Sequence, residues 1–258
     1  MKTILLTFDV EEFDLPKEYN QEISEKEMFE ISKQGLESLL NLLGKYKIPA
    51  TFFTTANFAK KFPKLIEETS KQHEIACHGL EHSDSYINDI SRIQEAKTEI
   101  EKIIKKQING FRAPRFKISD ISLLSGLSFS YDSSTHPIYL PGRYNNLFQK
   151  KNIHKIGDLI EIPMSTLLPN FSIFFLAFKN FPFSYAKTFT KINFLLRNYT
   201  MLTLHPWEFI DISKFKVPWH INRVYGQKLL TKFENYIKFC KKQGYVFESV
   251  RDFLTKSQ

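Results

Sequence analysis

The sequence predicts an α/β fold in which short buried strands alternate with amphipathic helices and curl toward a barrel. Apolar runs of strand length alternate with longer segments of helical periodicity along the chain. About seven such strands in 258 residues fit a distorted (β/α) barrel of parallel strands better than an open sheet. Side chains with acid–base or metal-binding chemistry follow several strand ends, where such barrels carry their active sites.

The N-terminal half alternates strands and helices regularly. The apolar run from Ile4 to Phe8 predicts a buried parallel strand, and Pro49–Thr54 and Glu74–Cys77 predict two more. A helix is predicted from Glu27 to Tyr46 because leucine, isoleucine and phenylalanine recur there at helical spacing. A second helix over roughly Asn57 to Gln72 connects the next two strands.

The C-terminal half continues the pattern with shorter strands. Isoleucines from Ile90 to Ile104 mark one helix, and a second helix is predicted from Tyr225 to Lys242. The remaining strands are predicted at Gly110–Pro114, Phe129–Asp132, Leu159–Pro163, Tyr199–Leu204 and Tyr245–Phe247. Because the chain contains no internal repeat, linker or low-complexity tract, we predict a single domain over residues 1–258.

Composition and charge exclude several classes of protein. Charged residues at 25% and hydrophobic residues at 42% are typical of a globular protein rather than a disordered or fibrous one. The net charge is +8, but the lysines are spread over predicted helix faces instead of forming one block. We therefore expect no nucleic-acid partner. The sequence leaves the oligomeric state open.

Cysteine usage and the N-terminus favour a cytoplasmic location. Cys77 and Cys240 are the only cysteines and lie far apart, so the chain has no disulfide framework. The apolar run before Asp9 is too short for a signal-peptide core, and no stretch approaches the ~20 apolar residues of a membrane span.

Two histidines at a spacing of four, His78 and His82, are the clearest sign of chemistry in the chain. On one face of a helical turn they could share a divalent ion. Acidic residues that include Asp9 and Glu11 end the first predicted strand, and His205 follows a later one. Imidazole and carboxylate ligands suit zinc, iron or cobalt, and a spare acid and histidine supply what hydrolysis needs.

Five short motifs stand in a fixed order along the chain: Thr7-Phe8-Asp9-Val10-Glu11, His78-Gly79-Leu80-Glu81-His82, Phe111-Arg112-Ala113-Pro114, Tyr131-Asp132-Ser133-Ser134 and Leu202-Thr203-Leu204-His205-Pro206. This set resembles the polysaccharide deacetylases with a NodB-type domain (carbohydrate esterase family 4), in the branch whose first motif reads Asp-Val-Glu or Asp-Val-Asp. The resemblance extends from residue 3 to about residue 252. It implies a distorted (β/α) barrel, a hydrolase of carbohydrate metabolism that removes an N- or O-acetyl group from a sugar, and one divalent metal ion, with zinc as the expected metal.

The resemblance also assigns roles to individual residues. It makes Asp9 the general base, Arg112 the partner of that base, and His205 the general acid. His78 and His82 match the metal ligands of the family.

Four further residues are assigned to the substrate-binding site, and two more aromatic residues could add to it. By resemblance, the backbone N–H of Arg115 matches the oxyanion donor and Leu204 would line the acetyl pocket. Trp207 and Tyr131 are aromatic residues that could stack on sugar rings, as are Tyr139 and Trp219.

The chain departs from the family at the third metal ligand. Most relatives have two adjacent aspartates, the second of which binds the metal, but here that position is Val10. In an extended strand Asp9 and Glu11 point to the same side, so Glu11 is the expected ligand, with Asp14 as the alternative if the chain turns inward. This departure keeps two other functions open: a same-fold amidohydrolase that acts on a small C–N substrate without metal, and an inactive carbohydrate-binding module.

The segment from Asn170 to Arg197 is rich in phenylalanine and interspersed with lysine. It predicts either helices packed on the outside of the barrel or an interfacial patch against an anionic membrane. In the second case the protein would lie peripherally on the cytoplasmic face, where a lipid-linked acetylated saccharide would be presented. Neither the identity of the sugar nor the choice between an N- and an O-acetyl group follows from the sequence.

Overall fold

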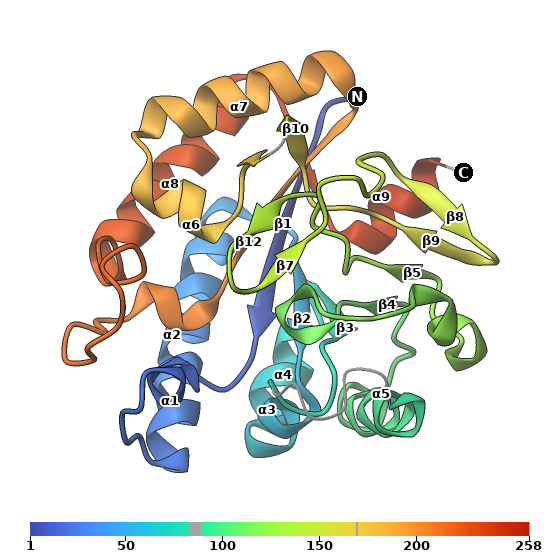
Figure 1. Cartoon of the computed structure of the whole chain (residues 1–258), viewed down its shortest axis with the longest axis vertical. Coiled ribbons are helices and arrows are strands. Elements are labelled where there is room, and N and C mark those ends of the chain that lie inside the picture. The colour runs from blue at the N-terminus through green and yellow to red at the C-terminus, as the bar shows by residue number, and fades with distance from the viewer. Residues whose placement is uncertain (83–88, 169, 258) are drawn as a thin grey trace.

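A curled sheet of nine strands forms the centre of the computed structural model, which describes residues 1–82, 89–168 and 170–257 (Figure 1). In spatial order its strands are β12 (Tyr199–Leu204), β1 (Thr3–Val10), β2 (Thr51–Thr54), β3 (Glu74–Cys77), β4 (Gly110–Phe111), β5 (Tyr131–Asp132), β9 (Leu159–Glu161) and β8 (His154–Ile156), with β13 (Val246–Glu248) also paired to β1. All neighbours are parallel except the antiparallel pair β8–β9. The α/β fold with about seven parallel strands is thereby confirmed.

The sheet curls without closing. Within the described residues no ladder joins its two edge strands, β8 and β12. On the free edge of β12, an isolated parallel bridge instead joins Thr203 to Phe174. That bridge brings a segment from the phenylalanine-rich region beside the end of β12.

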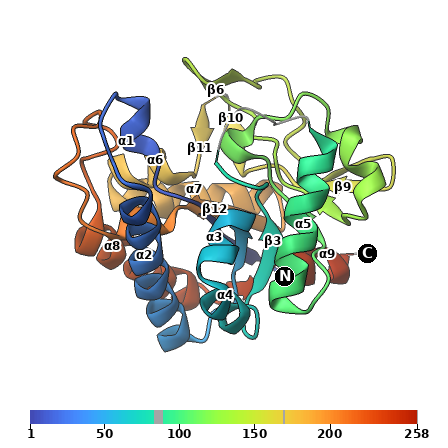
Figure 2. The same ribbon diagram turned by 90° about the horizontal axis from the view of Figure 1, so that it is seen from below.

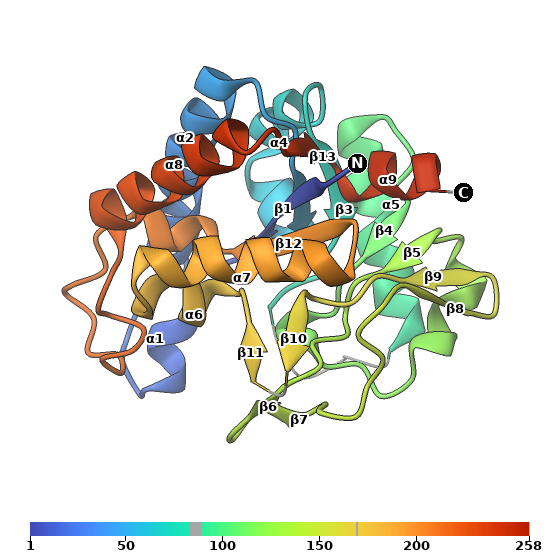
Figure 3. The same cartoon turned by 90° about the horizontal axis from the view of Figure 1, so that it is seen from above.

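Helices surround the sheet, and Figures 2 and 3 show the longer ones on its outside. The α-helices are α1 (Leu15–Glu18), α2 (Glu25–Tyr46), α3 (Ala56–Lys61), α4 (Pro63–Thr69), α5 (Ile90–Ile104), α6 (Phe175–Asn180), α7 (Phe183–Leu196), α8 (Gly226–Lys242) and α9 (Val250–Ser257). Short 3-10 helices are η1 (Pro114–Phe116), η2 (Ile121–Leu127) and η3 (Pro206–Phe209), and two small hairpins are β6 (Tyr139–Leu140) with β7 (Tyr144–Asn145) and β10 (Thr166–Leu168) with β11 (Phe171–Ser172).

One predicted helix is interrupted. The helix expected over residues 57–72 is two helices, α3 and α4, which meet at Phe62. Pro63 begins α4, where its missing N–H costs no hydrogen bond, but a proline at this point cannot continue the preceding helix.

The strands place alternate side chains on the two faces of the sheet. In β1, Leu6 and Phe8 pack in the cluster between the sheet and the helices, together with Leu202 and Leu204 of β12. Residues one position away face the inside of the curled sheet, as Asp9 does. Both faces are buried, because every residue of β1 and β12 is buried.

Helices α6 and α7 account for most of the phenylalanine-rich segment. Phe178, Phe189 and Phe194 are buried against the rest of the protein. The segment therefore forms helices on the outside of the sheet. Leu195 and Leu196 are exposed, at the end of α7 that precedes the N-terminal end of β12. Among the described residues, no helix has both the length and the apolar composition needed to cross a membrane.

A glycine lets α2 approach the chain just after β12. A Cβ atom built on Gly35 would lie only 1.9 Å from the carbonyl oxygen of Pro206. Since Pro206 directly follows His205, this close contact between α2 and η3 sets the position of that histidine.

We predict that Gly35→Ala lowers the free energy of unfolding by about 1–3 kcal/mol, because the added methyl group forces α2 and η3 apart. Gly44→Ala is the matched control in the same helix: nothing lies within 4 Å of its Cβ position, so the variant should be about 0.5–1 kcal/mol more stable than the parent. Urea unfolding of both variants measures the difference. Equal stabilities would contradict the close contact.

Candidate active site

A cleft at the C-terminal ends of the strands brings together most of the titratable residues singled out by the sequence. It has a volume of about 330 Å³, and its lining includes Asp9, Glu11, His78, His82 and His205. These residues lie at or just after the ends of β1, β3 and β12. The parallel arrangement places these strand ends at the same edge of the sheet, as expected for such folds.

Three of these side chains form a cluster that could hold a metal ion. The Nε2 atoms of His78 and His82 each lie 3.3 Å from Oε2 of Glu11, and the three ligand atoms all lie within 4.8 Å of one another. Oε2 of Glu11 and Nε2 of His78 are buried and have no hydrogen-bond partner. Buried polar atoms without partners are costly, and a cation bound between them would satisfy both. The residues present therefore fit a divalent metal.

The outer nitrogens of both histidines are held by other groups. Nδ1 of His78 lies 2.8 Å from the carbonyl oxygen of Arg112, which can only accept, so Nδ1 donates. Nδ1 of His82 lies 3.0 Å from Oδ1 of Asp14. A donating Nδ1 leaves the lone pair on Nε2, the atom that faces Glu11. Glu11 is thus the carboxylate within the cluster, and Asp14 orients one of its histidines.

The histidine pair reaches the cluster from a loop, not from the helical turn that its spacing suggested. Gly79 has φ of 78°, in the left-handed region, and turns the chain directly after His78. The carbonyl groups of Gly79 and Leu80 accept from the N–H groups of Ala56 and Asn57 at the start of α3, at 3.0 and 2.9 Å. These bonds would be lost if the loop were helical, so the contact with α3 overrides the helical spacing.

Charges within the cluster favour a cation at its centre. Burial opposes ionisation of Glu11, but His82, His205 and His78 together lower its pKa to about 2. Burial likewise disfavours the charged form of His82, yet Glu11 and Asp14 raise its pKa to about 9. The neighbouring Glu12 is different: burial raises its pKa to about 7, and its Oε2 accepts from the hydroxyl group of Thr55 at 3.3 Å.

Asp9 is held by a fully buried arginine. Nη1 of Arg112 donates to Oδ1 of Asp9 at 2.7 Å, and both side chains are buried. The rest of the guanidinium group donates to the carbonyl and hydroxyl oxygens of Ser133 at 3.1 and 3.0 Å. The second carboxylate oxygen of Asp9, Oδ2, lies 4.0 Å from Nε2 of His205. Asp9 therefore has one oxygen fixed by arginine and one directed toward the cleft.

His205 has a partner of its own. Its Nδ1 lies 2.6 Å from Oε1 of Glu208, and its Nε2 lies 3.9 Å from Oε1 of Glu11. Burial alone would lower the pKa of His205, but the negative charges of Glu11, Glu208 and Asp9 raise it. The ring is packed between Trp207, stacked at 5.1 Å, and the edge of Phe175 at 4.8 Å.

Glu208 and the lysine behind it were not identified from the sequence. Glu208 is fully buried, and Nζ of Lys179 in α6 lies 3.6 Å from its Oε2. Burial lowers the pKa of Lys179 despite the nearby carboxylate. The position of Glu208 three residues after His205 was a usable signal, because a 3-10 turn brings such residues together. Lys179 is 26 positions away from His205 and carried no signal.

Two of the four predicted substrate contacts are wrong. Arg115 and Trp207 line the cleft, whereas Tyr131 and Leu204 do not. Leu204 packs between the sheet and the helices, because strand alternation directs it away from the side on which His205 lies. Tyr131 is buried, and its hydroxyl group donates to Glu74 at 2.9 Å.

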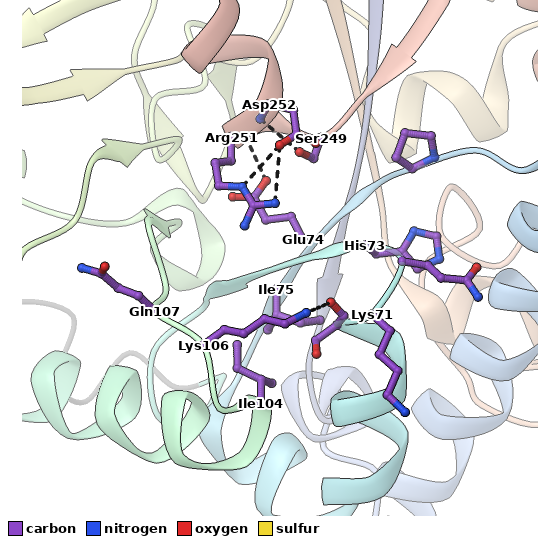
Figure 4. Close-up of a pocket in the computed structure, with 13 residues that line it drawn as sticks. Lys71, His73, Glu74, Ile75, Ile104, Lys106, Gln107, Ser249, Arg251 and Asp252 are labelled. Carbon is purple, nitrogen blue, oxygen red and sulfur yellow. Dashed lines mark hydrogen bonds and ion pairs between the residues drawn. The ribbon is translucent and has the colours of Figure 1, made fainter.

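Glu74 belongs to a second, smaller cavity at the opposite end of β3. This cavity, about 160 Å³ in volume, is drawn in Figure 4. The carboxylate of Glu74 accepts from the hydroxyl group of Thr51 at 2.8 Å and from the backbone N–H of Arg251 at 3.0 Å. With Tyr131 as a third donor, these bonds attach the start of α9 to the sheet, and Glu74 has a structural role.

Comparisons with known proteins support the resemblance. The profile of the polysaccharide deacetylase family matches residues 1–132, which include the ligand cluster, Asp9 and Arg112. The peptidoglycan-N-acetylmuramic acid deacetylase PdaA of Bacillus subtilis (strain 168) is 30% identical over 120 residues, which are 44% of this chain and 46% of that protein. A peptidoglycan deacetylase of Helicobacter pylori (strain ATCC 700392 / 26695) is 29% identical over 109 residues, 39% of this chain and 36% of that protein. The chain thus matches less than half the length of each of these relatives.

Solved structures agree on the fold. A probable polysaccharide deacetylase from Pseudomonas aeruginosa PAO1 superposes with a TM-score of 0.68 at 16% identity, over 98% of this chain and 89% of that one. PuuE allantoinase superposes with a TM-score of 0.67 at 16% identity, over 97% and 88% of the two chains. At these identities the likeness concerns the fold alone.

A pair of buried carboxyl groups supports the strand ends beneath Arg112. Asp132 accepts from the backbone N–H and the hydroxyl group of Ser134 at 2.9 and 2.7 Å, and the Ser134 hydroxyl oxygen accepts from the N–H of Ala113 at 2.8 Å. Burial, followed by the charge of Asp132, holds the pKa of Glu161 well above its usual range. The pKa of Asp132 is also raised, mainly by burial, so the two carboxyl groups together retain a proton above the pH at which an isolated carboxyl group ionises.

This proton makes stability depend on pH. In the unfolded chain Glu161 ionises near its ordinary pKa of about 4.3, so above that pH the native state binds more protons and its stability falls as pH rises. We predict that Glu161→Gln removes this loss, which reaches about 1.4 kcal/mol per pH unit for one proton. Urea unfolding from pH 5 to pH 8 measures it. Asp158→Asn, an exposed carboxylate in the preceding turn, is the control and should keep the parent's slope; an unchanged slope in Glu161→Gln would contradict the shared proton.

Proposed function

Because the chain belongs to the polysaccharide deacetylase family, we propose that it hydrolyses the N-acetyl group of an acetylated saccharide. One observation supports this proposal above the others. The free oxygen of Asp9, the Nε2 atom of His205 and the Glu11–His78–His82 cluster all face one point in the cleft. A base, an acid and a metal site around one point are what metal-assisted amide hydrolysis requires.

In this proposal Glu11, His78 and His82 would hold one divalent cation, for which we propose zinc. The cation would supply Lewis acidity, polarising the acetyl carbonyl group and acidifying a water molecule. Asp9, held by Arg112, would accept the proton of the attacking water at Oδ2. His205 would donate a proton from Nε2 to the leaving nitrogen, while Glu208 holds its Nδ1–H.

A second candidate is an amidohydrolase that acts on a small C–N substrate. The modest cleft volume favours it. The metal-dependent deacetylase is favoured by the buried Oε2 of Glu11 and Nε2 of His78, which have no hydrogen-bond partner. Metal dependence and acetate release separate the two candidates.

We predict that the purified protein binds about one equivalent of zinc and that Glu11→Gln abolishes both binding and acetate release. Asp14→Asn should weaken zinc binding about 10- to 100-fold, because only an outer partner of His82 is altered. Asp9→Asn should keep zinc and lose at least about 10²-fold in turnover. Elemental analysis, zinc titration calorimetry and an acetate assay provide the readouts.

Glu12→Gln is the matched control for that series. It alters the adjacent carboxyl group, which hydrogen-bonds Thr55 and lies outside the cluster, so zinc stoichiometry should stay at about one. Full zinc occupancy in Glu11→Gln would transfer the third ligand position from Glu11 to Asp14.

We also propose that the protein is cytoplasmic and that the exposed part of residues 170–197 makes peripheral contact with a membrane. Ile192, Leu195 and Leu196 are 40%, 78% and 66% exposed on α7, and Lys191 is exposed beside them. These side chains lie toward the end of α7 that leads to the start of β12, away from the cleft at the strand ends. A membrane at this surface would leave the cleft facing the cytoplasm.

Vesicle co-sedimentation tests this contact. Burial of apolar surface contributes ~25 cal/mol per Å², and each cationic side chain near anionic lipid contributes ~1 kcal/mol, so we expect binding to anionic vesicles. The double variant Leu195→Ser with Leu196→Ser should weaken this binding about tenfold or more. Leu123→Ser, an exposed leucine outside the segment, serves as control. Lack of binding to anionic vesicles would remove the membrane contact and leave the deacetylase proposal intact.

A further inference from the structure

A chain of ion pairs connects Asp14, Arg115, Glu18 and Arg143. Nη2 of Arg115 lies 3.4 Å from Oδ2 of Asp14 and 2.9 Å from Oε1 of Glu18. Both Nη atoms of Arg143 contact the carboxylate of Glu18, Nη1 at 3.3 Å from Oε1. We call these four residues the strap. Its first member, Asp14, is also the partner of the proposed ligand His82.

The strap crosses the mouth of the curled sheet. Asp14 and Glu18 follow β1, Arg115 follows β4, and Arg143 lies in the β6–β7 hairpin, which follows β5. In the sheet, β2, β3 and β4 separate β1 from β5. A contact between Glu18 and Arg143 therefore joins the segments that follow β1 and β5, at the end of the sheet where the cleft lies.

Cavities lie on both sides of the strap. The cleft with the candidate active site, about 330 Å³, is lined by Glu18, Arg115 and Arg143. An outer cavity of about 670 Å³ is lined by Lys17, Met28 and Asn57 instead. Asp14 and His82 line both cavities. Asp14, the member of the strap that contacts His82, therefore lies between the two cavities.

The strap is well placed to resist displacement. The side chains of Arg115 and Glu18 are 17% and 19% exposed, and that of Arg143 is 32% exposed. Charged groups linked in a partly buried network hold together better than an isolated surface pair. Each arginine also fixes a carboxylate through a planar group, which limits sideways motion.

The cleft that remains is small and has apolar walls. Its volume is at the lower end of the ~300–1,000 Å³ typical of ligand pockets. Leu15 and Tyr19 line it next to one end of the strap, Leu140 and Tyr144 next to the other, and Phe174 and Leu176 opposite the histidine loop. Apolar walls of this kind suit the faces of a sugar ring.

We propose that the strap makes the cleft a blind pocket, which admits a free or chain-terminal N-acetylated amino sugar and excludes an internal unit of a polymer. This inference rests on the proposed deacetylase function. Glu18 and Arg143 are the specificity-determining residues of the pocket, because their contact bounds the cleft at its mouth.

The test uses a pentamer of N-acetylglucosamine labelled with ¹⁸O at its reducing end, and tandem mass spectrometry to locate the units that lose acetate. The parent protein should deacetylate one terminal unit only. Glu18→Ala and Arg143→Ala should raise deacetylation of internal units about 10- to 100-fold relative to the terminal unit. Lys105→Ala, which breaks the exposed pair with Glu67, is the control and should change nothing.

Binding separates this inference from the proposed function. In saturation-transfer NMR with Asp9→Asn, the acetyl methyl signal of one terminal unit alone should respond. Internal deacetylation by the parent protein, or contact along the whole pentamer, would overturn the blind pocket while leaving the deacetylase intact. Absence of acetate release would refute the proposed function, and the NMR pattern would still decide the pocket; absence of binding would overturn both.

Discussion

The buried guanidinium group of Arg112 is the interaction on which the site depends. Its side chain binds Asp9 on β1 and Ser133 after β5, and it stacks on Phe53 of β2 at 3.9 Å. Its carbonyl oxygen holds the ring of His78 after β3. One residue thereby connects the proposed general base, a proposed metal ligand and four strands of the sheet. Removing one partner of the Asp9–Arg112 pair would leave a buried charge without its counter-charge. This is typically far more costly than losing a surface ion pair.

The two halves of the proposed chemistry are supported from opposite sides of the cleft. The base is aimed from within the sheet by Arg112, whereas the acid is held by Glu208 and, behind it, by Lys179 from α6. The phenylalanine-rich segment thus packs against the sheet and also supports the candidate active site. It supplies a buried cation and, through Phe175, one side of the packing around His205.

The acidic residues after β1 illustrate how neighbours in sequence acquire different tasks. Glu11 enters the ligand cluster, Asp14 orients His82, and Glu18 extends across the mouth of the cleft. Glu12 turns toward Thr55 instead. Their charges are similar, so the differences arise from burial and from the partner that each side chain meets.

The sequence by itself determined the α/β class, most strand positions and the residues of the candidate metal cluster. These follow from local periodicity and from the rule that parallel strands present their C-terminal ends together, so Asp9, His78 and His205 were expected to meet. The tertiary structure decided the contacts that local sequence patterns do not predict. It placed the hydroxyl group of Tyr131 against Glu74, and it brought Lys179 to Glu208 and Arg143 to Glu18. Such contacts join segments far apart in the chain, and no local pattern encodes them, because they depend on how the loops pack once the sheet has curled.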